Sequence, residues 1–296
     1  MSIRDARRFS GAFPALPTPF DRQGEFRPEP LRALVRDLIL QGVEGFYALG
    51  STGESLLLSV NERKNVLETI VSEARGEATV IAHVGAASPR DALELGRHAA
   101  ALGVDAISSV PPIYFGYTFE QIKRYYASLC ELGVPVLLYN IPSMSGVRFT
   151  TAQLIELMQD PRVLGVKNTA KDYFQLERLR AACPDAILYN GFDETFLAGQ
   201  VMGCSGGIGS TYNVMPAKFQ SILDAVGRGD IPAAARLQRS VNNVVDAMLP
   251  GGVIPSLKTV LKAQGYDFGH CREPFTPLTE SQRHRLLEVC KDEGVL

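Results

Sequence analysis

Short apolar segments alternate with longer amphipathic segments along the first two thirds of the chain. The apolar segments are rich in β-branched residues and end near Leu16, Leu49, Val84, Val110, Tyr139, Lys167, Tyr189 and Gly209. Between them, apolar residues recur at the spacing of one helix face in the ranges 30–41, 61–73, 91–102, 120–132, 151–158, 173–182 and 194–202. Eight strand–helix units with nearly continuous apolar strands predict an α/β fold, the (β/α)8 TIM barrel.

The pattern changes beyond about residue 230. The ranges 231–248, 253–264 and 279–291 are helix-like, and no strand-like segment separates them. We therefore expect a barrel over residues 1–229 and a C-terminal extension of three helices over 230–296. No proline- and serine-rich linker interrupts the series, so the extension is expected to pack on the barrel within a single domain.

Charge and hydropathy exclude several classes of partner. The formal net charge is -2, which predicts neither a nucleic acid nor a membrane surface as partner. No uninterrupted apolar run reaches the roughly 18 residues of a membrane span. Residues 1–8 carry charges without an apolar core behind them, which is not the pattern of a secretory signal. The sequence therefore predicts no nucleic acid and no membrane as partner.

The five cysteines (Cys130, Cys183, Cys204, Cys271 and Cys290) form no close pairs along the sequence. This spacing argues against a zinc site or a disulfide framework and fits a reducing, cytoplasmic environment. Each cysteine is expected to be a small buried hydrophobic residue.

A barrel of this type places its chemistry at the carboxyl ends of the strands. The polar residues near those ends are therefore the candidate site, namely Ser51, Thr52, His83, Tyr114, Tyr139, Lys167, Thr169, Asp193, Glu194 and Ser210. For His83, a core position held by a hydrogen bond is favoured over a role as a base.

Lys167 closes the apolar run 163–166 and is the most informative of these residues. An ammonium group is costly to desolvate, and burial favours the neutral amine. A neutral lysine is a nucleophile that can form a Schiff base with a carbonyl substrate. Taken alone, a lysine at a strand end more often extends to the surface along its aliphatic stem.

A tyrosine at the end of a neighbouring strand supports the chemical interpretation. Tyr139 ends the preceding strand, and adjacent strands lie about 4.8 Å apart, so its phenol can reach the amine. A phenol there can move the proton that cleavage of a carbon–carbon bond requires. Tyr189 ends the strand on the other side of Lys167 in a similar sequence, 188–190. Spacing alone does not choose between the two tyrosines.

Three further segments suggest ligand contacts. Gly50–Glu54 has glycines on both sides of two hydroxyl residues, an arrangement that can bind a carboxylate or phosphate but lacks the lysine of a nucleotide-binding loop. The glycine-rich segment 206–210 ends the eighth strand and gives room for an anion or a bulky ligand. Asp193 and Glu194 can accept hydrogen bonds from a polyhydroxyl chain, although acidic residues are also common in a first helical turn.

These motifs together resemble the class I pyruvate aldolases related to dihydrodipicolinate synthase. The matching segments are Gly50–Glu54, the Tyr-Asn-Ile-Pro sequence at 139–142, and Val166-Lys167 followed by Thr169. The resemblance covers nearly the whole chain. It implies the barrel fold and a Schiff-base reaction that needs no cofactor or metal.

The branch of the family can be narrowed from two segments. Met144 stands where dihydrodipicolinate synthases usually carry an arginine, and a methionine cannot bind a carboxylate in a fork. The segments 189–194 and 206–213 resemble those of the sialic acid aldolases, which reversibly cleave N-acetylneuraminate to N-acetylmannosamine and pyruvate. Lys171 and Ile254 depart from that pattern and bear on sugar preference.

The resemblance also implies roles for individual residues. Lys167 forms the Schiff base, Tyr139 rather than Tyr189 transfers the proton, and Ser51 and Thr52 bind the pyruvate carboxylate. The sugar chain is held by Thr169, Gly191, Asp193, Glu194 and Ser210. Tyr114 enters the site of a neighbouring subunit and completes a proton relay with Ser51 and Tyr139, which implies a homotetramer built as a dimer of dimers. The alternatives are an aldolase for 2-keto-3-deoxy sugar acids, a dihydrodipicolinate synthase, and a non-catalytic sensor of keto acids.

Overall fold

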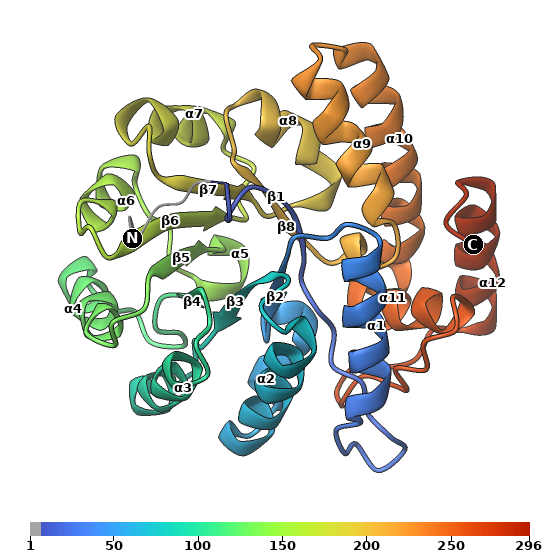
Figure 1. The fold of residues 1–296 in the computed structure, drawn as a ribbon, viewed down its shortest axis with the longest axis horizontal. Helices are drawn as coiled ribbons and strands as arrows, with labels where there is room; N and C mark the ends of the chain where they lie inside the picture. The colour runs from blue at the N-terminus through green and yellow to red at the C-terminus, as the bar shows by residue number, and fades with distance from the viewer. Residues whose placement is uncertain (1–6) are drawn as a thin grey trace.

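The computed structural model describes residues 7–296 and forms a (β/α)8 barrel (Figure 1). Most of the segment on which the secretory-signal prediction depends therefore lies outside the described residues. The eight strands are β1 (Gly11–Pro14), β2 (Gly45–Ala48), β3 (Thr79–His83), β4 (Ala106–Ser109), β5 (Val136–Asn140), β6 (Val163–Asn168), β7 (Ile187–Asn190) and β8 (Gly206–Gly209). All paired strands are parallel, in the order β1-β8-β7-β6-β5-β4-β3-β2. A parallel bridge between Ala15 and Tyr47 joins β1 to β2 and closes the barrel.

Helices surround the strands on the outside (Figure 1). They are α1 (Pro28–Leu40), α2 (Val60–Ala74), α3 (Pro89–Ala101), α4 (Phe119–Cys130), α6 (Thr151–Met158), α7 (Tyr173–Ala182), α8 (Phe196–Val201) and α9 (Pro216–Gly227). Capping boxes explain where α2, α4 and α6 begin, because the side chains of Ser59, Thr118 and Thr150 each accept a hydrogen bond from the third helical residue. The sequence predicts seven of these helices to within a few residues and misses α9.

Three helices follow the barrel, as the sequence predicts. They are α10 (Ile231–Met248), α11 (Val253–Ala263) and α12 (Glu280–Asp292). α10 packs against α9, and α12 packs against α10 and α11, so the extension lies on one side of the barrel (Figure 1). Within the described chain, no single helix is long and apolar enough to cross a membrane, although the bent pair Ile231–Gly251 and Val253–Ala263 passes that test jointly.

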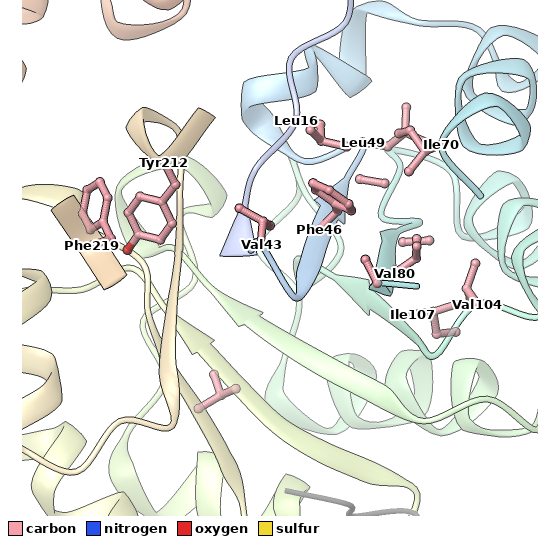
Figure 2. Close-up of a cluster of buried hydrophobic side chains, with 14 of the residues drawn as sticks. Leu16, Val43, Phe46, Leu49, Ile70, Val80, Val104, Ile107, Tyr212 and Phe219 are labelled. Atoms are coloured by element: carbon pink, nitrogen blue, oxygen red, sulfur yellow. The ribbon is translucent and has the colours of Figure 1, made fainter. Parts of the chain in front are cut away.

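The strands separate two hydrophobic clusters. The outer cluster lies between the strands and the helices, and Figure 2 shows part of it, including Phe46, Ile107 and Phe219. The inner cluster fills the barrel and contains Tyr139 and Tyr189. Side chains of each strand alternate between these clusters, because successive residues of a strand point to opposite faces.

One irregularity interrupts this alternation in β6. Val136 of β5 pairs with Val163, whereas the next residue, Leu137, pairs with Gly165. β6 therefore contains one residue, Leu164, more than its partner strand, which is the definition of a β-bulge. Beyond the bulge the ladder is regular again.

The bulge decides which way Lys167 faces. Val163 and Val166 belong to the outer cluster, whereas Leu164 belongs to the inner one. Strict alternation from Val163 would turn Lys167 toward the helices, because a slip of one residue exchanges the two faces. With the extra residue, Lys167 lies opposite Tyr139 and points into the barrel.

The cysteine prediction is correct for two residues and wrong for three. Cys130 and Cys290 are buried in the outer cluster. Cys183, Cys204 and Cys271 are only partly buried, because they lie beyond helix ends and in loops, although Cys183 and Cys204 still pack against the outer cluster. Among the described residues, none of the five cysteines forms a disulfide.

Candidate active site

Lys167 lies near the carboxyl end of β6 with only 4% of its surface exposed. Its Nζ atom is 4.1 Å from the centre of the Tyr139 ring and 4.3 Å from the centre of the Tyr47 ring. Tyr139 is its neighbour in the β5–β6 ladder, and Tyr189 is its neighbour in the β6–β7 ladder. The amine is therefore enclosed by aromatic rings at the mouth of the barrel.

The two candidate tyrosines have different surroundings. The Tyr139 ring packs edge-on against the rings of Tyr47 and His83, with centres 6.0 and 5.9 Å away. Tyr189 is fully buried against Phe13, and its hydroxyl has no hydrogen-bond partner among the described residues. Burial raises the pKa of Tyr189 well above its ordinary value. Of Tyr139 and Tyr189, it is Tyr139 whose ring face lies against the Lys167 amine.

Tyr47 is a neighbour of the amine that the candidate residues of the sequence do not include. It is fully buried in β2, and its hydroxyl donates a hydrogen bond to Ser108 Oγ at 3.0 Å. Burial is the main reason that the pKa of Tyr47 is raised well above its ordinary value, and Tyr139 adds to the effect. The signal was present in the sequence, because an aromatic residue near a strand end at an inward position faces the same site.

The loop after β2 folds into a tight turn, Ser51–Gly53. Ser51 is exposed and Thr52 is buried. Thr52 Oγ1 and Ser210 Oγ lie 2.7 Å apart, within hydrogen-bond distance, so the turn is joined to the end of β8. The structure thus brings together two segments that the sequence presented as separate candidates for anion binding.

Asp193 and Glu194 form the first residues of a short helical turn after β7, Asp193–Thr195. Asp193 is buried and accepts hydrogen bonds from the backbone N–H and the hydroxyl of Thr211, both at 2.7 Å. Burial raises the pKa of Asp193 from 3.8 to about 6, against the opposing effect of those hydrogen bonds. Glu194 is partly exposed, and its carboxylate lies 3.7 Å from Nζ of the exposed Lys171.

Thr169 supplies a buried hydroxyl near the same rim. It follows β6, and its Oγ1 atom has no hydrogen-bond partner among the residues that the structure describes. A Cβ atom at Gly191 would lie 1.9 Å from this oxygen, so only glycine fits there. Thr169 Oγ1 is therefore a buried polar atom at the end of β6 to which no described residue binds.

His83 is held as the sequence analysis favours. It is buried, its Nδ1 lies 3.0 Å from the carbonyl oxygen of Leu49, and its Nε2 accepts a hydrogen bond from the Val110 N–H at 3.4 Å. Burial, with Arg63 and Lys167 nearby, lowers the pKa of His83 well below its ordinary value. A neutral ring with both nitrogens engaged is a structural element of the site wall.

Tyr114 is not brought to the other candidates within this chain. Its side chain is 91% exposed, and its backbone has the left-handed φ of 83°. The Tyr114 ring packs edge-on against Phe115, another exposed aromatic residue.

Two of the residues that depart from the family pattern, Met144 and Ile254, also have defined positions. Met144 is exposed on the short helix α5 (Pro142–Ser145), and Ile254 lies partly buried in α11.

A metal site is not formed by the described residues, which contain no group of three or more histidine, cysteine, aspartate or glutamate side chains placed to hold an ion. The fold and the enclosed amine define a (β/α)8-barrel protein with a buried lysine at the carboxyl ends of its strands. Comparison of the sequence with models of protein families identifies the family. The chain belongs to the dihydrodipicolinate synthetase family, whose model matches residues 8–293.

Several similar proteins are N-acetylneuraminate lyases or sialic acid aldolases by name, and a dihydrodipicolinate synthase of Bacillus anthracis is also similar in structure, with a TM-score of 0.92 at 27% identity. An N-acetylneuraminate lyase of Salmonella typhimurium is 43% identical over 278 residues, which are 93% of this chain and 94% of the relative. A catalytic lysine mutant of the Ruminococcus gnavus sialic acid aldolase is similar in structure with a TM-score of 0.95 and 33% identity, covering 98% of this chain and 97% of that one. CdNal of Clostridium difficile in complex with mannosamine has a TM-score of 0.93 at 34% identity, with 96% and 99% covered.

Proposed function

We propose that this protein is a class I sialic acid aldolase, a carbon–carbon lyase of the oxo-acid type. It reversibly cleaves N-acetylneuraminate to N-acetylmannosamine and pyruvate through a Schiff base on Lys167. The observation that carries the proposal is the enclosure of the Lys167 amine by the rings of Tyr139 and Tyr47 at the barrel mouth. The names of the relatives support the choice of substrate.

The lysine does the covalent chemistry without a cofactor. The Lys167 amine adds to the keto carbon of the open-chain sugar, and uptake of a proton with loss of water leaves an iminium ion. Tyr139 gives its phenol proton to the relay through Ser51 and accepts the proton of the C4 hydroxyl while the bond between C3 and C4 breaks. The electron pair of that bond moves into the iminium to form an enamine, and the aldehyde N-acetylmannosamine leaves. Protonation of the enamine carbon and hydrolysis release pyruvate and restore the amine.

The remaining candidates bind the two ends of the substrate. Ser51 and Thr52 donate to the pyruvate carboxylate from the turn after β2. The polyhydroxyl chain lies against Thr169, Gly191, Asp193, Glu194 and Ser210. The unused hydroxyl of Thr169 and the carboxylate rim at Asp193 and Glu194 supply the donors and acceptors that hydroxyl groups require.

Assembly completes the site in this proposal. Tyr114 is exposed in the single chain, and in a homotetramer arranged as a dimer of dimers it enters the site of the neighbouring subunit. There it extends the proton relay of Tyr139 and Ser51. The cysteines are scattered and form no disulfide within the described chain, which fits a cytoplasmic location.

Reductive trapping tests the Schiff base directly. Borohydride added with pyruvate is expected to attach the reduced three-carbon unit to Lys167 and to abolish activity, with the label located by peptide mass spectrometry. Lys171 is the internal control, because it lies near the same rim but is exposed. Lys167→Ala is expected to lose both label and activity.

Substrate release distinguishes the proposed activity from that of other pyruvate aldolases. Pyruvate release is expected from N-acetylneuraminate in preference to a panel of 2-keto-3-deoxy sugar acids. Full activity of Lys167→Ala, or a label on any other lysine, would contradict the mechanism. Preference for a shorter keto-deoxy acid would contradict the substrate but leave the Schiff base in place.

A further inference from the structure

The carboxylate of Glu54 is buried beneath the C-terminal extension, at the end of the turn that carries Ser51 and Thr52. Glu54 adopts the left-handed backbone conformation with φ 56°, and its N–H donates to the Ser51 carbonyl oxygen at 3.0 Å. A non-glycine residue in this conformation is held there by its surroundings rather than by local preference. What surrounds its side chain therefore determines the shape of the turn.

Both carboxylate oxygens of Glu54 bind residues from the far end of the chain. Lys258 of α11 places Nζ 2.7 Å from Oε1, and the backbone N–H of Arg272 donates to Oε2 at 2.8 Å. The two charged side chains are almost completely buried, with 2% of Lys258 and none of Glu54 exposed. Lys258 is fixed in turn by a hydrogen bond to the His270 carbonyl oxygen at 2.9 Å.

A second contact anchors the other end of the same loop. The Arg272 guanidinium donates to the carbonyl oxygen of Leu57 at 2.8 Å and pairs with Glu62 at the start of α2. The ring of Phe20 lies against both cations, 4.4 Å from Lys258 Nζ and 4.6 Å from the centre of the guanidinium group. The loop after β2 is thus attached to residues 258–272 at Glu54 and again at Leu57.

A buried ion pair of this kind is poorly explained by net stability. The desolvation of two charges offsets most of their attraction, and neutral packing of equal volume is often as stable. What such a pair supplies is location, since neither charge can move without leaving the other unpaired. The chemistry proposed for Lys167 uses neither residue, yet Glu54 directly follows the turn that carries Ser51 and Thr52.

We propose that Glu54 and Lys258 are positioning residues for the substrate carboxylate. The pair holds the Ser51–Gly53 turn at the barrel mouth, so that its N–H and O–H groups meet the carboxylate of the Lys167 adduct. The C-terminal extension is by this inference a part of the pyruvate site, although it contributes no group that touches pyruvate. The inference rests on the proposed function, because it needs pyruvate as the ligand.

The test compares two ketones at the same lysine. Pyruvate carries a carboxylate and acetone does not, so only pyruvate depends on the turn. In Lys258→Met, the pyruvate concentration that gives half-maximal borohydride trapping at Lys167 is expected to rise about tenfold, as small misplacement of binding groups produces. Trapping of acetone is expected to stay near the wild-type rate. Lys262→Met, one turn further along the same helix and exposed, is the matched control and should leave both unchanged.

A general structural defect gives a different result. It would lower the trapping of both ketones together, and that outcome overturns the inference, as does unchanged trapping of both. The double variant Glu54→Gln/Lys258→Met removes the unpaired charge and is expected to recover unfolding temperature without recovering pyruvate affinity. If affinity returns together with unfolding temperature, the pair acts on stability alone and the inference fails.

Failure of the inference and failure of the proposed function can be told apart in the wild-type protein. If wild-type Lys167 traps no pyruvate, the proposed function itself is wrong. If wild-type Lys167 traps pyruvate and Lys258→Met does so with the same concentration dependence, only the positioning role is wrong.

Discussion

Around Lys167, aromatic ring faces occupy the space that water would occupy at a surface amine. The faces of Tyr47 and Tyr139 lie close to Nζ, and His83 stands behind Tyr139 as a neutral ring. A carbonyl carbon that enters this space meets an amine with few competing water molecules. The arrangement suits reversible imine chemistry, in which water must leave and return in a controlled order.

Asp193 gives a pH dependence that belongs to the residue scale. Its pKa is raised from 3.8 to about 6, mainly by burial, so the folded state holds the proton more tightly than the unfolded state. Stability from this group is fully present below about pH 4 and is lost as the pH rises through about 6. The loss amounts to about 3 kcal/mol, and Asp193→Asn should remove it.

Urea unfolding of both proteins from pH 4.5 to pH 7 measures this difference. The free energy of unfolding of Asp193→Asn is expected to rise relative to the wild type as the pH increases. Parallel curves for the two proteins would show that the Asp193 carboxyl is not the group responsible.

At the residue scale, the sequence predicts the site better than it predicts the contacts that organise it. Lys167, Tyr139 and Thr169 stand at strand ends, where periodicity and barrel topology place functional groups. Tyr47 was passed over because a buried aromatic residue in a strand is most often a core residue. The contact between Glu54 and Lys258 leaves no local signal, since the two residues are joined only by tertiary folding. The assignments of substrate-binding roles remain predictions.

The bulge in β6 is the feature that matters most at the scale of single elements. It turns Lys167 from the helix layer into the barrel, and the residue after the extra one, Gly165, has no space for a side chain. A Cβ atom there would lie 1.8 Å from the carbonyl oxygen of Ile187 in β7. A strict two-residue period in the sequence therefore could not have given the correct face for Lys167.

Gly165→Ala is expected to disturb both packing and chemistry. The new methyl group forces β6 and β7 apart, at a cost of about 3 kcal/mol or more in the free energy of unfolding. It should also displace the amine and slow the trapping of pyruvate in the molecules that remain folded. Thermal unfolding and borohydride labelling measure the two effects.

Gly227→Ala is the control for this change. Gly227 ends α9, and a Cβ atom there meets no other atom within 4 Å. The unfolding temperature of the Gly227→Ala protein is expected to stay near that of the wild type. A Gly165→Ala protein as stable as this control would mean that the strands can separate at little cost.

Capping residues mark the starts of α2, α4, α6 and α12, but α1 and α11 are predicted without one, so a missing cap alone does not explain why α9 is missed. α9 begins with Pro216, and no side chain caps its first turn. The segment after β7 was expected as one helix over 194–202, but it divides into the turn Asp193–Thr195 and the helix Phe196–Val201. The Asp193 carboxylate accepts hydrogen bonds from Thr211, and no side chain caps either element.

At the scale of the whole molecule, the exposed Tyr114 leads to a prediction about shared sites. Chains with Lys167→Ala and chains with Tyr114→Phe are each expected to be inactive or nearly so. When the two are dissociated, mixed and reassembled, a site that takes Lys167 from one chain and Tyr114 from the other regains both groups. Random mixing should restore about a quarter of the sites.

Activity and sedimentation measured before and after mixing decide the question. Recovery of activity together with a tetramer in sedimentation is the expected result. If mixing restores nothing, or if the active protein sediments as a monomer, Tyr114 does not serve a neighbouring site.

The division at residue 229 between barrel and extension stays a prediction, since the packing of α10 on α9 continues across it.

The pairing of β1 with β8 has a consequence for how the chain is made. β1 is synthesised before the other seven strands, but the strand that fills most of its hydrogen bonds is the last of the eight. Until residues 206–209 emerge, the growing sheet has an open edge on both sides. Open edges pair readily with other chains, so the unfinished polypeptide is most prone to misassociation during this interval. Slower synthesis between β1 and β8 would lengthen the exposure, and the nascent chain would need a chaperone over that stretch.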